Sequence, residues 1–240
     1  MRYQSLLATS LLNLALAACG TKGGNDNAQM AQERQSRADA TVEAAQLPAS
    51  QSSSDRLLAA AEPFELLTET AFTDPPAKLD TTIASGRKAI GDIRALLDPA
   101  VATKIDGLFV QVDHSRAGSK PVDLAISSIE IYRALVSSVP PGAKVPSDVS
   151  LLDYAGFRFQ ADLKAVPVRW DDMKSAASFA RARWTAVKPK VKDQSVAAPF
   201  DAALSNMEMA ANKQNTALAT SSVTAELDQV DKLESFFGRQ

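Results

Sequence analysis

From Asp55 onward, apolar residues recur at spacings of three and four, and this period is broken only at short clusters of Pro, Gly, Asp and Ser. No stretch alternates β-branched and polar residues between hairpin turns, which argues against a sheet. The pattern therefore predicts an all-α fold of about eight helices. The expected segments are residues 55–73, 78–97, 99–114, 121–139, 147–166, 173–187, 196–218 and 222–237.

Several of these segments carry one apolar stripe, which is typical of a helix that buries one face. Helices joined by short loops pack as antiparallel neighbours, so we expect an up-and-down bundle. The strongest break is Pro140-Pro141-Gly142, and residues 140–146 either separate two four-helix halves or form a longer connection within one domain. The clearest stripes are Leu152, Ala155, Phe159 and Leu163; Met173, Ala177, Ala180, Trp184 and Val187; Phe200, Leu204, Met207 and Ala211; and Leu227, Val230, Leu233 and Phe237.

Two glycines, Gly86 and Gly91, interrupt the second segment. Each costs about 1 kcal/mol relative to Ala inside a helix. We interpret both as positions where a neighbouring helix packs closely.

The chain begins with a positive charge at Arg2, followed by an almost wholly apolar stretch from Leu6 to Ala18. This stretch has the length of a signal-peptide core and is too short to span a bilayer as a helix. It ends in Leu16-Ala17-Ala18-Cys19, which resembles the lipobox of bacterial prolipoproteins. The resemblance implies cleavage before Cys19, a diacylglycerol thioether on its sulfur and acylation of the new amino terminus, which palmitate can supply.

Cys19 is the only cysteine in the chain, so it has no partner for a disulfide. The alternative is an ordinary secretory signal with a chance cysteine, which would leave a reactive thiol in an oxidising compartment. Several acyl chains make a stable anchor, since each buried CH₂ adds about 0.8 kcal/mol. Gly20 is the second residue of the predicted mature chain; Asp at that position resembles an inner-membrane retention signal, so Gly20 favours the periplasmic face of the outer membrane.

Residues 20–54 are poor in large apolar side chains and rich in Gly, Asn, Gln, Ala and Ser. Such a composition cannot bury enough apolar surface to offset the entropy of ordering, so it predicts a flexible tether. A tether of this length has a root-mean-square reach of about 30 Å. The expected organisation is a signal peptide at 1–18, the lipidated cysteine and tether at 19–54, and the helical domain at 55–240.

The charge balance gives no reason to expect a nucleic-acid partner. Removal of residues 1–18 takes away Arg2 and no acidic side chain, so the net charge moves from −2 to −3. Nucleic-acid binding normally calls for a clustered basic face. The expected partners are therefore the membrane, through the N-terminal lipid, and an envelope protein.

His114 is the only histidine, which removes most catalytic and metal schemes. A di-iron bundle needs two Glu-x-x-His pairs, and zinc sites need several His or Cys ligands. At a predicted helix end, His114 is expected to complement the helix dipole. No cofactor is predicted, and a haem held by His114 and Met207 or Met209 is the alternative, although Met207 also fits an apolar stripe.

Carboxylates and phenols offer a second candidate site, for iron or another hard cation. Asp123, Ser127 and Glu130 form a narrow polar stripe on a segment that is otherwise apolar around most of its circumference, which predicts a central helix. Tyr132, Asp153 and Tyr154 are expected nearby in the bundle. The simpler interpretation, which we favour, is that the stripe faces solvent or pairs with a cation such as Arg158.

The segment around 173–187 and the residues after it are basic, whereas the last segment is acidic. We expect the two faces to be solvated and to attract one another across the bundle. The alternative is that the basic face binds anionic lipid headgroups or an acidic partner. The basic residues are Arg169, Lys174, Arg181, Arg183, Lys188, Lys190 and Lys192, and the acidic ones are Glu226, Asp228, Asp231 and Glu234.

Three functions remain open. The preferred one is a noncatalytic interaction or accessory module of the cell envelope, which recognises a partner through helical surfaces. The second is a periplasmic carrier that holds a metal, a haem or a small apolar molecule within the bundle. A hydrolase is the weakest, because the chain is so poor in histidine.

Overall fold

The computed structural model describes residues 52–239, which form eight α-helices and two short 3-10 helices, with no strand in that range. The all-α prediction is confirmed. The predicted leader, Cys19 and most of the predicted tether lie outside the described residues. The α-helices are α2 (Ser53–Thr70), α3 (Pro76–Ile93), α4 (Pro99–Ala117), α5 (Pro121–Val136), α6 (Ser147–Leu163), α7 (Trp170–Val187), α8 (Gln194–Lys213) and α9 (Thr216–Gly238), and the 3-10 helices are η1 (Arg94–Leu96) and η2 (Lys188–Lys190).

Local side chains define where several helices begin. Ser52 and Asp55 form a capping box, in which the Ser52 hydroxyl accepts from the Asp55 amide at 3.1 Å and the Asp55 carboxylate accepts from the Ser52 amide. Asp98 and Asp193 cap α4 and α8 in a similar way. Because of the capping box, the first helix begins at Ser53, two residues before the predicted start.

The boundary between the last two helices was predicted wrongly. The expected helices ended at Leu218 and began at Ser222, whereas α8 ends at Lys213 and α9 begins at Thr216. Gln214 adopts a left-handed conformation with φ 51°, which stops α8, and the Asn215 side chain accepts from the Leu218 amide at 3.0 Å. Asn215 was the only local signal, since Ala-rich residues on both sides favour helix.

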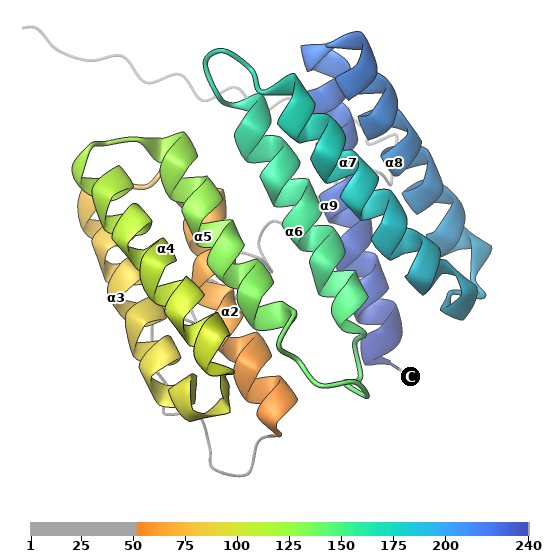
Figure 1. The fold of residues 1–240 in the computed structure, drawn as a ribbon. Helices are drawn as coiled ribbons and strands as arrows, with labels where there is room; N and C mark the ends of the chain where they lie inside the picture. The colour runs from red at the N-terminus through yellow and green to blue at the C-terminus, as the bar shows by residue number, and fades with distance from the viewer. Residues whose placement is uncertain (1–51, 240) are drawn as a thin grey trace, which may run out of the picture. The chain divides into compact units, whose positions relative to one another are not determined.

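The helices form two sets of four that meet along α5 and α6 (Figure 1). In the first set, α2 contacts α3 and α5, and α5 contacts α4. In the second set, α6 contacts α7 and α9, and α8 contacts both α7 and α9. Neighbours in contact run antiparallel, as predicted for an up-and-down bundle. All eight helices belong to one compact unit, and the division at 140–146 into separate halves stays a prediction.

The predicted apolar stripes form the core. All named members of the stripes on α7, α8 and α9 are buried, and on α6 only Leu163 is partly exposed. α5 contacts α2, α4 and α6, so it is the central helix that its all-round apolar pattern predicted. Among residues 52–239, no helix is both long enough and apolar enough to cross a membrane.

The two glycines of α3 differ in their surroundings. A Cβ on Gly86 would lie 2.9 Å from the Phe64 ring of α2, so this glycine permits the close approach that we expected. No atom lies within 4 Å of the position that a Cβ on Gly91 would take, so the interpretation was wrong for Gly91. The spacing of glycines in a helix does not say which of them faces a neighbour.

Candidate functional site

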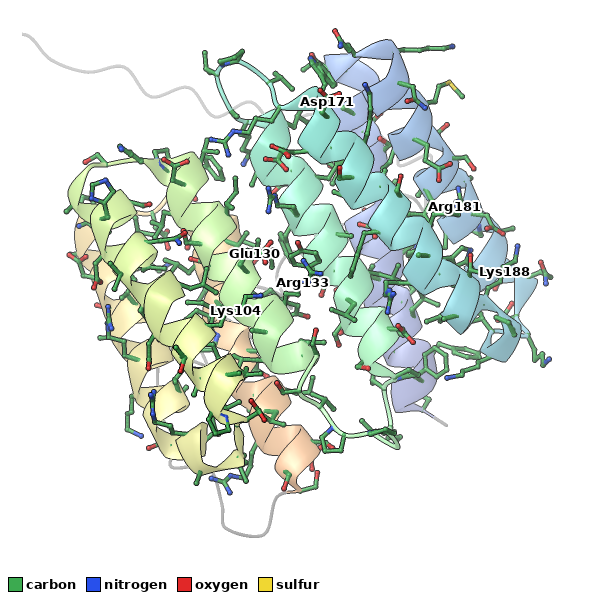
Figure 2. All side chains as sticks on the ribbon, in the orientation of Figure 1. Lys104, Glu130, Arg133, Asp171, Arg181 and Lys188 are labelled. Carbon is green, nitrogen blue, oxygen red and sulfur yellow. The ribbon has the colours of Figure 1, made fainter. Side chains whose placement is uncertain are left out.

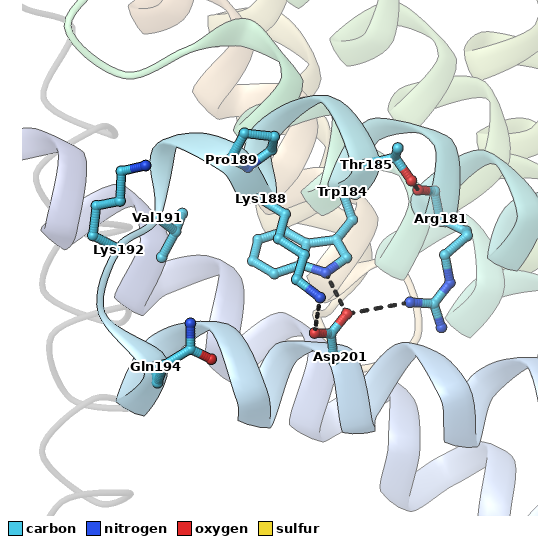
Figure 3. Close-up of a pocket in the computed structure, with 9 residues that line it drawn as sticks. All are labelled: Arg181, Trp184, Thr185, Lys188, Pro189, Val191, Lys192, Gln194 and Asp201. Carbon is cyan, nitrogen blue, oxygen red and sulfur yellow. Dashed lines mark hydrogen bonds and ion pairs between the residues drawn. The ribbon is translucent and has the colours of Figure 1, made fainter.

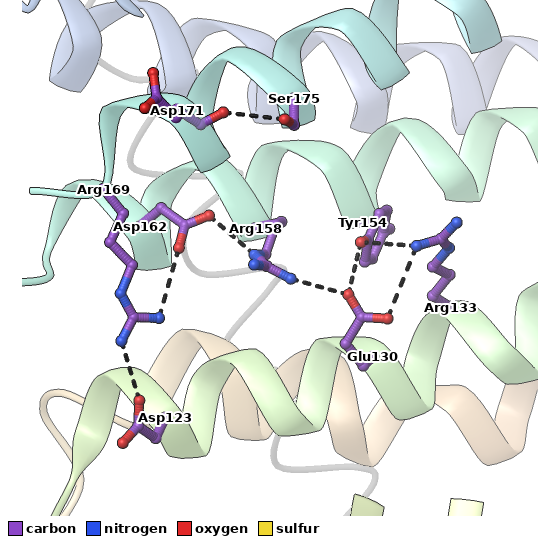
Figure 4. A network of polar contacts seen from close by, with 9 residues as sticks. All are labelled: Asp123, Glu130, Arg133, Tyr154, Arg158, Asp162, Arg169, Asp171 and Ser175. Atoms are coloured by element: carbon purple, nitrogen blue, oxygen red, sulfur yellow. Dashed lines mark hydrogen bonds and ion pairs between the residues drawn. The ribbon is translucent and has the colours of Figure 1, made fainter. Parts of the chain in front are cut away.

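The polar stripe of α5 lies along the boundary between the two four-helix sets, where it faces polar side chains of α6. The Tyr154 hydroxyl donates to Glu130 Oε1 at 2.7 Å, and Arg158 Nη1 donates to the same oxygen at 3.0 Å. Arg133, one turn further along α5, lies 3.8 Å from Glu130 Oε2 (Figure 4). The Glu130 carboxylate is therefore held from both helices.

The same contacts continue along α6 to the start of α7. Arg158 Nε donates to the Asp162 carboxylate at 2.9 Å, and Arg169 Nη1 lies 3.9 Å from the other Asp162 oxygen. Arg169 also donates to Asp123 on α5 at 3.2 Å. Asp123 and Glu130 are thus joined indirectly, through a chain of two arginines and the buried Asp162. We call these residues, together with Arg133 and Tyr154, the α5–α6 network.

Burial and neighbouring charges shift the pKa values of Tyr154 and Asp162 in the α5–α6 network. Burial, with the adjacent Glu130 carboxylate, raises the pKa of Tyr154 to about 12. Burial also raises the pKa of Asp162, although Arg158 opposes that shift. Tyr154 therefore stays protonated and donates a hydrogen bond to Glu130, and the Glu130 carboxylate is occupied by donors from its own chain. These hydrogen bonds and ion pairs hold α5 against α6.

The structure brings together some of the predicted site residues and separates others. Glu130 and Tyr154 are in direct contact, and the pairing of Glu130 with Arg158, which we favoured, is confirmed. Tyr132 and Asp153 are both buried, and the Asp153 charge adds to the burial that raises the pKa of Tyr132 well above its usual value. His114 is exposed in the last turn of α4, away from the α5–α6 network.

The candidates for metal or haem binding do not converge in the described range. Among residues 52–239, no group of three His, Cys, Asp or Glu side chains is placed to hold a metal ion. Met207 is fully buried on α8 in the second set, whereas His114 is exposed on α4 in the first. Met209 is 42 % exposed. Met207 is therefore part of the core, as its place in the apolar stripe indicated.

Sequence reasoning missed Asp162 and Arg169 as members of the α5–α6 network. The four-residue spacing of Arg158 and Asp162 on one helix was a usable signal. Arg169 had no comparable signal, because it lies in the connection before α7 and meets α5 only in the folded chain. The aromatic contact was also missed: Arg133 stacks 5.0 Å from the centres of both the Tyr154 and Phe179 rings.

We predicted that the basic segment and the last helix attract one another, and this prediction is wrong for three arginines. Arg169 pairs with Asp123 on α5, Arg181 with Asp201 and Glu208 on α8, and Arg183 with Asp148 on α6. Arg181 and Arg183 find partners on α8 and α6 because α7 lies between those two helices, whereas Arg169 precedes α7 and reaches α5.

A hollow of about 550 Å³ lies where α7, η2 and the start of α8 meet (Figure 3). Asp201 accepts from the Trp184 indole at 2.6 Å and from Lys188 at 2.6 Å, and Arg181 lies 3.5 Å away. Nothing in the sequence pattern indicated this hollow, because it depends on how η2 turns the chain between two helices. Its lining residues are Arg181, Trp184, Thr185, Lys188, Pro189, Val191, Lys192, Gln194 and Asp201.

Comparison with known proteins gave no relatives: no family model, no curated protein and no solved structure matches this chain.

Proposed function

We propose that this chain is a bacterial lipoprotein whose helical domain works outside the cytoplasm as a noncatalytic interaction module of the cell envelope. The observation that carries the proposal is the sequence Leu16-Ala17-Ala18-Cys19 after an apolar leader, with Cys19 as the only cysteine in 240 residues. A thioether at Cys19 tethers the domain to a membrane without a spanning helix. Gly20 as the second mature residue favours the outer membrane.

The test of the anchor is metabolic labelling with palmitate in a bacterium that processes lipoproteins. The full chain is expected to incorporate label and to lose residues 1–18, and mass spectrometry of its amino terminus should find an acylated Cys19. A Cys19→Ser variant should remain unlabelled. Label that persists in Cys19→Ser, or a mature terminus at any other residue, would refute the proposal.

The predicted outer-membrane location has its own test. Density-gradient fractionation is expected to find the wild-type protein with outer-membrane markers, whereas a Gly20→Asp variant should shift toward the inner membrane. Equal distribution of the two proteins would contradict the sorting part of the proposal and leave the anchor unaffected.

The interaction role is supported by the way the polar side chains are used. In the α5–α6 network the carboxylates of Glu130 and Asp162 are occupied by arginines of the same chain, so the network holds helices together.

The most exposed large apolar side chain of the described residues is Val166, 99 % exposed in the connection between α6 and α7. A photo-crosslinking residue at Val166 in living cells should give one discrete adduct with an envelope protein. The same residue at Met209 should not, and adducts of equal intensity from both positions would contradict the role.

The carrier is the second candidate, and the hollow beside Trp184 is the observation in its favour. A carrier role predicts that protein purified from its native host contains a ligand in stoichiometric amount. An absorption spectrum with elemental analysis of the same sample distinguishes the two candidates. A stoichiometric metal or a Soret band would overturn the interaction module in favour of the carrier.

A further inference from the structure

The start of the described chain and the connection between α7 and α8 lie at the same end of the domain. Arg56, in the first turn of α2, donates to the Asp92 carbonyl at the end of α3 at 2.8 Å. Arg183, near the end of α7, donates to Asp148 at the start of α6 at 3.1 Å. The antiparallel order of α2, α5, α6 and α7 therefore places the start of α2 and the end of α7 at one end of the domain (Figure 1). Figure 2 labels Asp171 and Lys188 at opposite ends of α7.

A short cluster of lysines lies at this end, which we call the basic end. Three of the five residues from Lys188 to Lys192 are lysines, and none is acidic. Lys144 lies in the connection between α5 and α6, which is at the same end. Lys188 pairs with Asp201 at 2.6 Å, whereas the exposed Lys144, Lys190 and Lys192 make no ion pair with any described residue.

Four acidic side chains at the basic end have partners within the domain. Asp55, Asp98 and Asp193 accept hydrogen bonds from backbone amides at the starts of α2, α4 and α8. Asp148 is paired with Arg183. The ion pair neutralises Asp148, and the positive ends of the helix dipoles offset part of the charge of the three capping carboxylates. Lys144, Lys190 and Lys192 have no ion-pair partner among the described residues, so their charge can act on a surface outside the domain.

The hollow beside Trp184 opens next to these lysines. Lys188 and Lys192 both line it, and the largely buried Trp184 and Val191 give it an apolar wall (Figure 3). A hollow of about 550 Å³ has room for a phosphodiester group and part of its glycerol. Cationic side chains beside an apolar wall suit a phospholipid headgroup at the membrane surface.

We propose that the basic end binds the surface of a bilayer that contains anionic phospholipid, with Lys190 and Lys192 as the main contacts and the hollow as the place where a headgroup phosphate sits. The predicted mature chain has a net charge of −3, so an anionic surface attracts this end and repels the molecule as a whole. The orientation in the cell rests on the proposed lipid anchor, which would enter the domain from this end. The headgroup binding itself does not depend on lipidation.

The test uses the chain from Gly20 to Gln240, which contains every described helix and carries no lipid or leader. Co-sedimentation is measured with vesicles of phosphatidylcholine alone, and with vesicles in which about a third of the lipid is phosphatidylglycerol. The wild-type chain should bind only the second kind, and its binding should weaken with added salt. The variant Lys190→Glu/Lys192→Glu should bind at least about 25-fold more weakly, because each surface lysine contributes about fivefold.

The matched control is Lys120→Glu/Lys213→Glu, which makes the same change of charge at two exposed lysines of the opposite end. This control should lose no more than about fivefold, since those residues do not face the bilayer. Circular dichroism of both variants shows whether the helices are kept.

Equal losses in the two variants would overturn the proposal, because they would report net charge alone. Failure of the wild-type chain to bind anionic vesicles would overturn it as well, and binding of a soluble acidic protein that the Lys190→Glu/Lys192→Glu change abolishes would then assign the basic end to a protein partner. Neither outcome touches the palmitate test, so the two proposals fail separately.

Discussion

Arg158 on α6 holds Glu130 on α5 at 3.0 Å, and the same guanidinium holds the fully buried carboxylate of Asp162 at 2.9 Å. One side chain therefore neutralises an acid in each of the two four-helix sets. Because α5 and α6 make the main contact between the sets, this relationship links the stability of the whole domain to a single residue.

Replacing Arg158 by Ala should destabilise the domain by about 3 kcal/mol, because it leaves the buried Asp162 without its closest counter-charge. Urea unfolding followed by circular dichroism measures this difference. Lys88→Ala is the control, since Lys88 and Asp92 form an exposed pair within α3 whose loss should cost about 0.5 kcal/mol or less. Similar losses in the two variants would show that the α5–α6 network contributes no more than a surface pair.

The tyrosines of the folded domain should lose their protons at a higher pH than tyrosines of the unfolded chain. The chain from Gly20 onward contains only Tyr132 and Tyr154, and burial raises the pKa of both, that of Tyr154 to about 12. The folded protein keeps protons that the unfolded chain releases near pH 10, so stability should fall as the pH rises from 10 toward 12. Phenolate absorbance of the folded and urea-unfolded chain measures the shift. A folded-state titration at the ordinary tyrosine pKa would contradict the buried geometry.

A Tyr154→Phe variant separates the two tyrosines. It should remove the step near pH 12 and leave only the titration of Tyr132, whose pKa burial raises well above its usual value. It also deletes the hydrogen bond to Glu130, which should cost about 1 kcal/mol at neutral pH.

Gly156→Ala should destabilise the contact between α6 and α9. A Cβ at Gly156 would overlap the Glu226 carboxylate and lie 2.6 Å from the Leu227 side chain, so the helices must move apart, at a cost of about 1–3 kcal/mol. The matched control is Gly91→Ala on α3, which has open space and should stabilise the domain by up to about 1 kcal/mol. Thermal unfolding measures the stability of both variants. A Gly156→Ala variant as stable as the wild type would show that α6 and α9 pack less closely than described.

Asp201 connects the hollow to the stability of α7 and α8. Burial raises the pKa of Asp201, but hydrogen bonds from Lys188 and Trp184 outweigh it, so the net shift is downward. A lowered pKa stabilises the folded state above the ordinary value of 3.8, and this contribution is lost as the pH falls through the lowered pKa.

Asp201→Ala should therefore destabilise at neutral pH by about 1–3 kcal/mol, because it leaves the Trp184 indole without its acceptor. Asp201→Asn keeps an acceptor for the Trp184 indole and should lose less stability. Urea unfolding at neutral pH, followed by Trp fluorescence, orders the variants. Equal losses in the two variants would mean that the charge of Asp201, which both lack, contributes more than its hydrogen bond to Trp184.

The fold was largely predictable because helix periodicity is a local property. The residues that bury one face of α7, such as Met173 and Trp184, recur at helical spacing whatever the helix packs against. The exception was the end of α8, where a left-handed Gln214 stops the helix inside a stretch of good helix formers. One backbone conformation outweighed the average propensity of its neighbours there.

The candidate site was predictable only in part. The polar stripe with Glu130 stands out on an apolar helix, and its pairing with a cation such as Arg158 was part of the favoured interpretation. Arg169 could not be assigned, because its partner Asp123 is 46 residues away and the two meet only when α5 and α6 pack. Periodicity identifies the face of a helix, and it carries no information about which distant residue lies opposite.

The helical class, the approximate extent of each helix and the buried faces could be read from the sequence alone, because they follow from residue spacing, caps and breakers within a few positions. The pairing of the helices, the arginine partners of Asp123, Glu130 and Asp162, and the placing of Lys144, Lys190 and Lys192 at one end arise only in the folded chain. Those features depend on contacts between residues far apart in the chain, which many helical sequences of the same pattern could arrange differently.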